Sequence, residues 1–220
     1  MEKHLYERLG LSKGLTSIIG SGGKTTLIRR LAGELKEDGF TVIVTTSTRI
    51  FIPDYCPLVC NSDASEEITE LLKKAGVVSV GRPTLTPQGA VKLEVPAGDF
   101  KKMKLLADFV LVEADGSKHR PLKAHADYEP VIPECSDRVV QVVGIDGIGK
   151  KVSEAVHRAE LFSRFTGLGP DDAVTSEAAA EVINRERLCD ILYFAGRSEE
   201  NLESAEKLKE LVEVPVVMEV

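Results

Sequence analysis

The sequence predicts an α/β fold built on a doubly wound, mostly parallel sheet, with a small β-hairpin insertion. Short apolar runs that suit buried strands alternate along the chain with amphipathic helix patterns, the order typical of a parallel sheet with helices on both faces. The run Phe109–Val112 is apolar throughout, as expected of a strand covered on both faces. A chain of 220 residues suits one domain, so we expect a single domain over residues 1–220.

Each element follows from a local pattern. The helix expected at 24–38 places Leu27, Leu31 and Leu35 on one face, and the helix expected at 63–76 has a capping residue in Asp63 or Ser65. Residues 82–96 alternate apolar and polar side chains, which predicts the hairpin. The other helices are expected at 97–106, 153–165, 175–184 and 199–213, and the strands at 15–20, 41–46, 77–81, 109–113, 138–144, 190–196 and 214–220.

The charge balance excludes a broad basic surface for nucleic acid, because the net charge is -7. No apolar run approaches the roughly 18 residues that a membrane helix needs. The first ten residues lack the apolar core of a signal peptide. We therefore expect a cytoplasmic protein with no nucleic-acid or membrane partner. Its cysteines are then reduced, and the spacing of Cys56 and Cys60 is a weak metal signal because no second Cys/His pair accompanies it.

The stretch GSGGKTT, between the first strand and the helix that follows it, predicts a phosphate-binding loop. The usual pattern G-x-x-x-x-G-K-[ST] has its first glycine where this chain has Ile18, so the loop is shortened by two residues. Glycines let backbone N–H groups curl around a phosphate, lysine adds a point charge, and a threonine hydroxyl binds Mg²⁺. The alternative is a glycine-rich turn beside a solvated lysine. The predicted nucleotide-binding residues here are Gly20, Ser21, Gly22, Gly23, Lys24, Thr25 and Thr26.

The next strand ends in a run of hydroxyl side chains, residues 45–48, followed by Arg49. The carboxyl ends of parallel strands form the ligand edge of such sheets, so these hydroxyls are expected near the phosphates. Thr46 and Thr48 are predicted to bind the nucleotide. The alternative is that threonine is simply a common strand residue. Arg49 either contacts phosphate or is a solvated loop residue.

The apolar strand at 109–112 runs directly into Glu113, and Asp115 follows two residues later. An acid at the end of a buried strand is the second half of many nucleotide-hydrolysing sites, where it binds Mg²⁺ or orients the attacking group. We therefore predict Lys24, Glu113 and Asp115 as catalytic residues, and Thr25 and Glu113 as metal ligands. A structural carboxylate at Glu113 and turn chemistry at Asp115 are the alternatives.

The loop after this strand, residues 115–125, gathers cationic side chains in an otherwise acidic chain. Lys118, Arg120 and Lys123 are predicted to bind a second, anionic substrate, because the loop should emerge on the ligand side of the sheet. The alternatives are a solvated basic loop, or a metal site that uses His119 and His125.

Three blocks together resemble the YqeC-like family, known as selenium-dependent hydroxylase accessory proteins. They are "IIGSGGKTTL", "VTTSTRI" and "VLVEADGSKHRPLKAHADYEPVIP", and the match continues in "VVGIDGIGK" and "VHRAE". The resemblance implies a P-loop NTPase fold and a role in maturation of molybdenum-containing hydroxylases. It extends the implied nucleotide and substrate site to Gly20–Thr26, Thr45–Thr48 and Glu113–Lys123.

The C-terminal part departs from the family. Family members commonly have an Asn-Lys-x-Asp-like stretch after a late strand, which implies guanine recognition, whereas Ala195-Gly196-Arg197 supplies no such Asp. We therefore expect ATP and Mg²⁺ as cofactors. The shortened loop also resembles that of Mur ligases, Gly-x-x-Gly-Lys-Thr-Thr, but over the loop only.

The expected function is Mg²⁺-dependent ATP hydrolysis or phosphoryl transfer by an accessory factor for a molybdenum- or selenium-dependent hydroxylase. Such a factor has a nucleotide, a second anionic molecule or cofactor, and a client hydroxylase as partners. The alternatives are a nucleotide-gated cofactor or metal chaperone with negligible turnover, or an ATP-dependent, ligase-like transferase.

Overall fold

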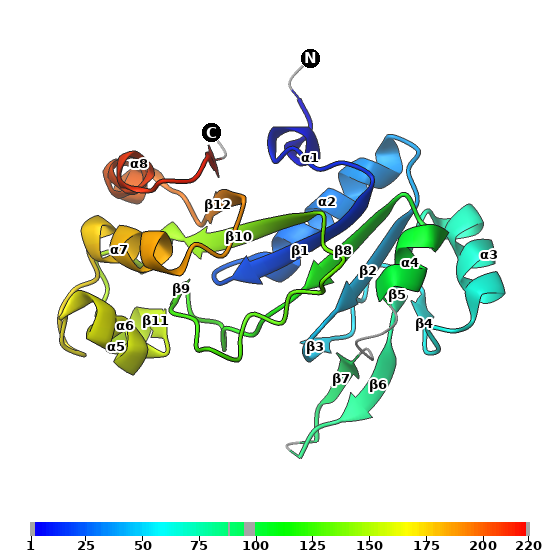
Figure 1. Cartoon of the computed structure of the whole chain (residues 1–220), viewed down its shortest axis with the longest axis horizontal. Coiled ribbons are helices and arrows are strands. Elements are labelled where there is room, and N and C mark those ends of the chain that lie inside the picture. The colour runs from blue at the N-terminus through cyan, green and yellow to red at the C-terminus, as the bar shows by residue number, and fades with distance from the viewer. Residues whose placement is uncertain (1–2, 88, 95–99, 219–220) are drawn as a thin grey trace. The chain divides into compact units, whose positions relative to one another are not determined.

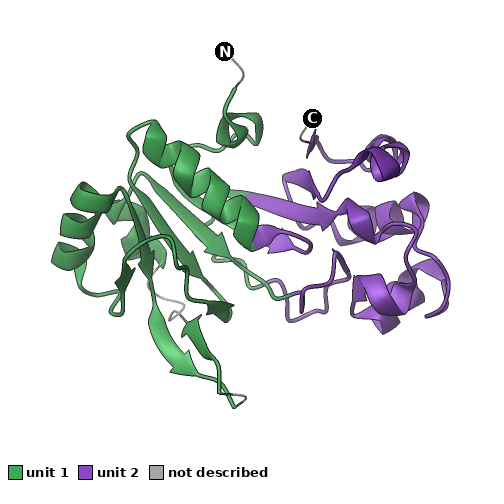
Figure 2. Ribbon diagram, turned by 180° about the vertical axis from the view of Figure 1, so that it is seen from behind, with its two compact units in different colours: residues 1–18, 25–116, 131–138 green, residues 19–24, 117–130, 139–220 purple. Residues whose placement is uncertain are grey.

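The computed structural model describes residues 3–87, 89–94 and 100–218. The chain divides into two compact units, shown in different colours in Figure 2. Unit 1 comprises Met1–Ile18, Thr25–Gly116 and Val131–Arg138, and unit 2 comprises Ile19–Lys24, Ser117–Pro130 and Val139–Val220. The expectation of a single domain over residues 1–220 stays a prediction.

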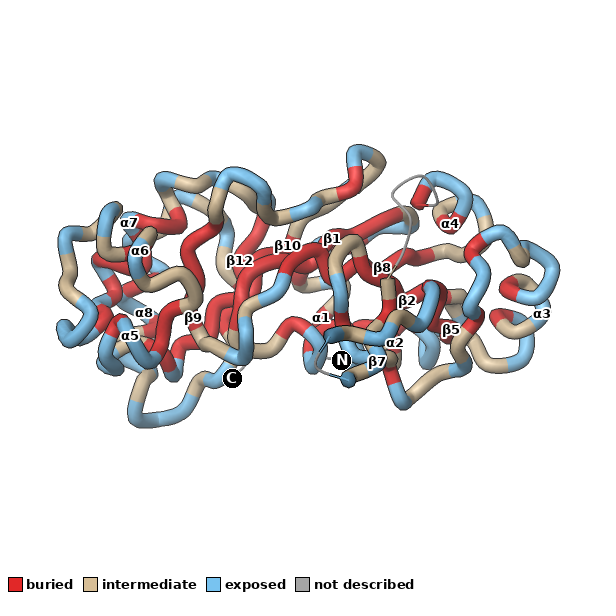
Figure 3. Tube along the Cα trace, turned by 90° about the horizontal axis from the view of Figure 1, so that it is seen from below, coloured by how far each residue is buried: buried red, intermediate tan, exposed pale blue. Residues whose placement is uncertain are grey.

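Parallel strands form the centre of unit 1. They lie in the order β1-β8-β2-β5-β4, and each adjacent pair in this unit is parallel. Residues of β2 and β8 are buried along their whole length, which Figure 3 shows in red and which explains their apolar sequences. The mostly parallel α/β fold predicted from the sequence is confirmed. The strand bounds are Gly14–Gly20 for β1, Val42–Thr46 for β2, Leu58–Val59 for β4, Val77–Val80 for β5 and Phe109–Glu113 for β8.

Three helices of unit 1 lie where the sequence predicts helices, one of them with a different cap, whereas α1 was not predicted. Leu27, Leu31 and Leu35 of α2 are all buried, as their spacing on one helix face requires. The N-cap of α3 is Ala64, without a side-chain hydrogen bond, so the prediction that Asp63 or Ser65 caps this helix was wrong. The helices are α1 (Leu5–Arg8), α2 (Lys24–Glu37, in unit 1 from Thr25), α3 (Ser65–Ala75) and α4 (Phe100–Leu106).

The predicted hairpin is present as an antiparallel sheet in unit 1. Strand β6 (Arg82–Leu85) pairs with β7 (Val91–Glu94), and β7 pairs in turn with β3 (Ile50–Phe51). Figure 1 shows β6 and β7 as two neighbouring arrows. Residues 88 and 95–96 of the predicted hairpin range 82–96, and residues 97–99 of the predicted helix range 97–106, lie outside the described residues.

Unit 2 carries two sets of parallel strands and most of the remaining helices. In the first set β12 lies between β10 and β13, and in the second β9 pairs with β11. Figure 1 places the helices α5 to α8 along this part of the chain. The strands are β9 (Leu122–Lys123), β10 (Arg138–Gly144), β11 (Val156–His157), β12 (Ile191–Ala195) and β13 (Val216–Met218). The helices are η2 (Ile145–Gly147), α5 (Val152–Ala155), α6 (Ala159–Thr166), α7 (Ser176–Glu186), η3 (Glu199–Asn201) and α8 (Leu202–Leu211).

The continuous helix predicted at 153–165 was wrong. The structure interrupts it with β11, and Arg158 then adopts the left-handed conformation at φ 63 before α6 begins. The competing interaction is the pairing of β11 with β9, which is distant in sequence and therefore leaves no local signal.

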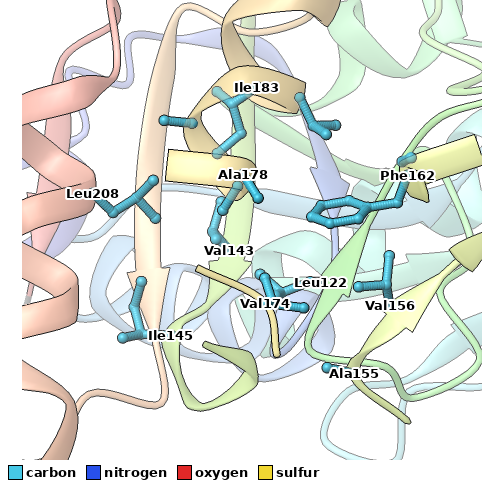
Figure 4. Close-up of a cluster of buried hydrophobic side chains, with 14 of the residues drawn as sticks. Leu122, Val143, Ile145, Ala155, Val156, Phe162, Val174, Ala178, Ile183 and Leu208 are labelled. Carbon is cyan, nitrogen blue, oxygen red and sulfur yellow. The ribbon is translucent and has the colours of Figure 1, made fainter. Parts of the chain in front are cut away.

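A cluster of buried apolar side chains holds unit 2 together. Phe162 of α6 belongs to this cluster together with residues of β9, β10, α5, α7 and α8, and Figure 4 shows part of the cluster. Burying a side chain of this size contributes roughly 2 to 3 kcal/mol to stability. Among the described residues, no helix is long and apolar enough to cross a membrane.

Candidate functional site

The glycine-rich loop forms a tight cradle in unit 2. Gly20, Gly22 and Gly23 have φ values of 87, 81 and 138, a region that favours glycine. A Cβ at Gly20 would lie 2.3 Å from the Val142 carbonyl oxygen, and one at Gly22 would lie 2.6 Å from Gly144 Cα. Other side chains cannot fit at these positions without moving the backbone of β10.

Hydrogen bonds fix the shape of this loop. The Ser21 amide donates to the Val142 carbonyl at 2.9 Å, and its hydroxyl donates to the Pro121 carbonyl at 3.0 Å. The Lys24 ammonium donates to the Gly20 carbonyl at 2.6 Å, and Lys24 is only 4% exposed. Helix α2 begins at Lys24, so its positive end directly follows the loop. The glycine cradle, the helix start and the lysine together fit a phosphate group.

The predicted acidic residues and the threonines that contact Glu113 belong to unit 1. Glu113, at the end of β8, lies in register with Ile18 on β1 and Thr46 on β2. The Thr25 hydroxyl donates to Glu113 Oε2 at 3.1 Å, and Glu113 is 8% exposed. Thr46 donates from its hydroxyl to the backbone carbonyl of Glu113 at 2.8 Å.

These oxygen donors fit a magnesium ion that also takes ligands from a nucleotide. Carboxylate and hydroxyl oxygens suit Mg²⁺, which in phosphate-binding sites usually has only one or two protein ligands. In the described part of the chain, no group of three or more His, Cys, Asp or Glu residues could hold a metal alone. The structure therefore brings together the predicted ligands Thr25 and Glu113, and the phosphates would have to complete the set.

The hydroxyl run at the end of β2 divides into structural and candidate ligand residues. The buried Thr45 hydroxyl donates to the Val80 carbonyl at 2.8 Å, so this side chain joins β2 to β5. Ser47 donates to the Val131 carbonyl, and Arg49 pairs with Glu94 at 3.2 Å. Thr46 and Thr48 lie within hydrogen-bond distance of each other, with 3.3 Å between their hydroxyls.

Asp115 lies beyond Glu113 and is almost completely buried, at 1% exposure. Backbone bonds anchor its neighbour Ala114, whose amide donates to the Ile18 carbonyl and whose carbonyl accepts from the Val131 amide, both at 2.9 Å. Asp115 is thus held in the interior of unit 1, on the segment that leads from the strand to the cationic loop.

The cationic loop contains two consecutive residues in strained conformations. Lys118 and His119 have φ values of 48 and 60, uncommon for residues other than glycine. Arg120 precedes Pro121, whose carbonyl accepts hydrogen bonds from Ser21 Oγ at 3.0 Å and the Gly144 amide at 2.9 Å. Within unit 2, the loop is thus tied directly to the phosphate cradle. Lys118 and Arg120 form no ion pair with any described residue.

Lys123, the third predicted cation, is instead part of a buried ion network. Its side chain is 1% exposed and its ammonium lies 3.0 Å from Glu129 Oε2. The other carboxylate oxygen of Glu129 accepts from Arg158, whose guanidinium also lies 4.9 Å from the centre of the Tyr128 ring. Burial alone raises the pKa of Glu129, but hydrogen bonds from Arg158 and Lys123 outweigh this and hold it below its usual range. The structure therefore places Lys123 in a charge-balanced network rather than on an open surface.

His157 and Arg158 are candidate residues that reasoning from the sequence missed. His157 lies opposite Lys123 in the β9–β11 register, and the helix predicted at 153–165 had concealed both residues. Burial lowers the pKa of His157 to about 4, and the positive charges of Lys123 and Arg158 add to this effect. His157 is therefore a neutral imidazole beside a cationic cluster. The block "VHRAE", noted only for its family resemblance, was the available signal.

His125 has a structural partner. Its Nδ1 lies 2.7 Å from Glu186 Oε2, and its backbone amide donates to Glu186 Oε1 at 2.6 Å. This buried pair ties the end of the loop to α7. The two contacts with Glu186 favour a structural role for His125 over the metal-ligand alternative.

The four cysteines are free thiols.

Comparisons with known proteins show the family of the chain. A curated relative, "Uncharacterized protein YqeC" of Escherichia coli (strain K12), is 38% identical over 172 residues, which cover 74% of this chain and 65% of the relative. The matched region therefore spans just under two thirds of the relative's length. The crystal structure of hydrogenase maturation factor HypB from Archaeoglobus fulgidus superposes with a TM-score of 0.44 and 13% identity, over 97% of this chain and 83% of that one. A similarity at that level carries no argument about function.

The sequence model of the family described as "YqeC protein" matches residues 16–160. This range contains the glycine cradle, Glu113, the cationic loop and His157. It extends over more than half of the chain, which therefore belongs to the YqeC family.

Proposed function

We propose that this protein binds and hydrolyses ATP with Mg²⁺, and that it serves as a maturation factor for a molybdenum- or selenium-dependent hydroxylase. The observation that carries nucleotide binding is the glycine cradle at 20–24, which admits no side chain at Gly20 or Gly22. The client class rests on the family resemblance of the sequence motifs.

Each part of the chain has a distinct role in this proposal. Backbone amides of the cradle and the Lys24 ammonium hold the phosphates, and Thr25 and Glu113 hold the magnesium ion. When bound, Mg²⁺ neutralises phosphate charge and orients the transferred group. Glu113 either serves the ion directly or orients the attacking group, and Asp115 is proposed to assist it. Thr26, Thr46 and Thr48 complete the set of proposed nucleotide contacts.

One observation favours GTP as the rival nucleotide. The end of β12 lies against the cradle, since a Cβ at Gly23 would be 3.2 Å from Ala195 Cβ. A Cβ at the next residue, Gly196, would be 3.0 Å from Asp146 Oδ1. A carboxylate is purely an acceptor, and guanine presents more N–H donors on its pairing edge than adenine. Asp146 also pairs with Lys150 at 3.3 Å, which reduces its availability and is consistent with ATP.

Calorimetric titration with ATP and GTP, each with and without Mg²⁺, tests both parts of this proposal. Tight binding that depends on Mg²⁺ and favours ATP supports it. Preference for GTP that is lost in Asp146→Asn would assign the base site to Asp146 instead. Absence of binding by either nucleotide would remove the proposed function.

The cationic loop is the proposed site of the second, anionic ligand. Lys118 and Arg120 are its cations without an ion partner among the described residues, and Pro121 ties Arg120 to the cradle. Lys123 and Arg158, bridged by Glu129, hold the loop beside β11. Phosphate and molybdate serve as oxyanion probes at saturating ATP. Arg120→Ala should abolish their binding and preserve ATP affinity, whereas Lys151→Ala, which changes an exposed lysine paired with Asp171 in the same unit, should affect neither.

A further inference from the structure

Helix α2 borders a hollow in unit 1 that has the size of a small-molecule site. Its volume is about 300 Å³, at the lower end of the range typical of ligand pockets. It is lined by α2, by the segment between β3 and β4, and by the junction of α3 with β5, all of which belong to unit 1. None of the described residues that line it belongs to the candidate nucleotide site. The apolar residues of its lining are Ala32, Gly33, Pro57, Ala75 and Val77.

Gly33 keeps this hollow open. It lies in the interior of α2, where glycine destabilises a helix relative to alanine. Packing does not require glycine there, because a Cβ at Gly33 would meet no atom of the described structure within 4 Å. Since Gly33 lines the hollow, the open space beside it is part of the hollow itself. A side chain at this position would occupy the space that a ligand could use.

Lys36 brings a positive charge without an ion partner to the hollow. Its stem lies beside the turn after α3, because its Cγ would be 3.0 Å from a Cβ at Gly76. Within the part of the chain that the structure describes, its ammonium forms no ion pair or hydrogen bond. The side chain is exposed, and its flexible stem lets the ammonium turn toward a bound anion.

Arg29 and Tyr55 add a second cation and an aromatic ring to the lining. The Arg29 guanidinium lies 5.0 Å from the centre of the Tyr55 ring, a cation–π contact. Arg29 also pairs with Asp54 at 3.5 Å, but the two side chains are 60% and 82% exposed, and such a pair is weak. Arg29 can therefore exchange Asp54 for the carboxylate or phosphate of a ligand, to which a guanidinium can donate two hydrogen bonds.

We propose that this hollow binds a small organic anion, with an apolar body of about single-ring size and a carboxylate or phosphate group. The apolar body packs against Val77 and into the space beside Gly33. Arg29 and Lys36 lie on the same face of α2, on either side of Gly33, and attract the anionic group. No acidic residue is among the described lining residues, so the charge of the hollow favours an anion. The inference does not depend on the proposed nucleotide function.

Two-dimensional NMR of the ¹⁵N-labelled full chain, titrated with benzoate or with phenyl phosphate, tests this site. The amide signals of Gly33, Ala75 and Val77 should shift and saturate, with a dissociation constant of about 1 mM for probes of this size. Benzyl alcohol carries a similar ring without the charge and should bind at least about tenfold more weakly. Shifts at these three amides distinguish the hollow from phosphate binding at the glycine cradle.

Three variants separate the site from a general effect on the fold. Gly33→Leu extends a side chain into the hollow, so it should abolish the shifts without lowering the melting temperature. Lys36→Gln removes the charge and should weaken the binding of both anions about fivefold. Arg30→Gln is the matched control, because Arg30 is an exposed cation of the same helix that bonds to Glu34 and does not line the hollow. Its affinity for the probes should equal that of the wild type.

The possible outcomes are distinct. The site would be overturned if neither anion produced saturable shifts at the three amides of the wild type, or if a folded Gly33→Leu variant bound them as tightly. Equal affinities for benzyl alcohol and the anions would overturn the assignment of an anionic ligand. So would unchanged anion affinity in Lys36→Gln, which decides the question even if Gly33→Leu does not fold.

Discussion

The Thr25 hydroxyl donates a hydrogen bond of 3.1 Å to the carboxylate of Glu113. One residue is the second of the helix that follows the glycine loop, and the other ends a buried strand far along the chain. This contact joins two of the separately predicted motifs in one place. It is the relationship from which the proposed magnesium site in unit 1 is built.

The first prediction concerns Glu113. Replacing it with glutamine keeps its size and one oxygen acceptor but removes the negative charge. ATP turnover should fall at least tenfold, since a magnesium ligand or orienting group is lost, whereas the melting temperature should change little. Steady-state hydrolysis and thermal unfolding of the same preparation measure both. A large loss of stability with unchanged specific activity would show that Glu113 serves the fold.

The second prediction tests the cradle. Gly22→Ala places a Cβ 2.6 Å from Gly144 Cα at a φ of 81, so it should cost about 2 kcal/mol or more of unfolding free energy and weaken ATP binding. Gly33→Ala is the control, because Gly33 is helical and its Cβ would meet no atom within 4 Å. That variant should gain about 0.5 to 1 kcal/mol. Chemical denaturation measures the unfolding free energy of both variants. Equal unfolding free energies for Gly22→Ala and Gly33→Ala would contradict the geometry of the cradle.

The third prediction is a dependence of stability on pH. The pKa of His157 is lowered to about 4 in the fold, by burial and by the positive charges of Lys123, Arg158 and Lys118, against the opposing charge of Glu129. Between this value and the ordinary value of about 6.5, the unfolded chain binds more protons than the folded one, so stability falls on acidification.

After allowance for the partial exposure of the ring, His157 should account for about 2 kcal/mol between pH 6.5 and pH 4. Denaturant titrations of the wild type and His157→Gln across this range measure the effect. The variant should show a shallower slope. A slope identical to that of the wild type would show that His157 titrates normally.

The fourth prediction concerns the Lys123–Glu129–Arg158 network. Glu129→Gln removes the carboxylate and leaves two cations facing each other, one of them with a side chain that is 1% exposed. Breaking a buried ion pair on one side typically costs about 3 to 5 kcal/mol. Asp171→Asn, which breaks the pair with Lys151 from an acid that is 83% exposed, should cost little. Denaturant titrations of the two variants measure these losses of unfolding free energy. Similar losses in Glu129→Gln and Asp171→Asn would contradict the description of Lys123, Glu129 and Arg158 as a buried ion network.

Features that depend on neighbouring residues in the chain could be predicted from the sequence, whereas contacts between residues far apart in the chain could not. The glycine loop and Glu113 could be placed because each depends on neighbours in the chain: glycines before a helix, and an acid after an apolar run. The break in the predicted helix at Arg158 could not be predicted, because the short strand before it pairs with Leu122 and Lys123, which are distant in the sequence. The partners of Thr45 and Lys123 were equally hidden, because a hydroxyl or an ammonium does not indicate in sequence which distant oxygen it will meet.

The most direct measurement of the central claim is calorimetric titration of Mg²⁺·ATP into the wild type and Lys24→Ala. Lys24 is 4% exposed and its ammonium donates to the Gly20 carbonyl at 2.6 Å, on the loop where phosphate is proposed to bind. Loss of the lysine charge should weaken binding about tenfold or more, because a charge-assisted contact to phosphate is removed. Equal affinities for the wild type and Lys24→Ala would contradict the account of a phosphate-binding loop at residues 20–26.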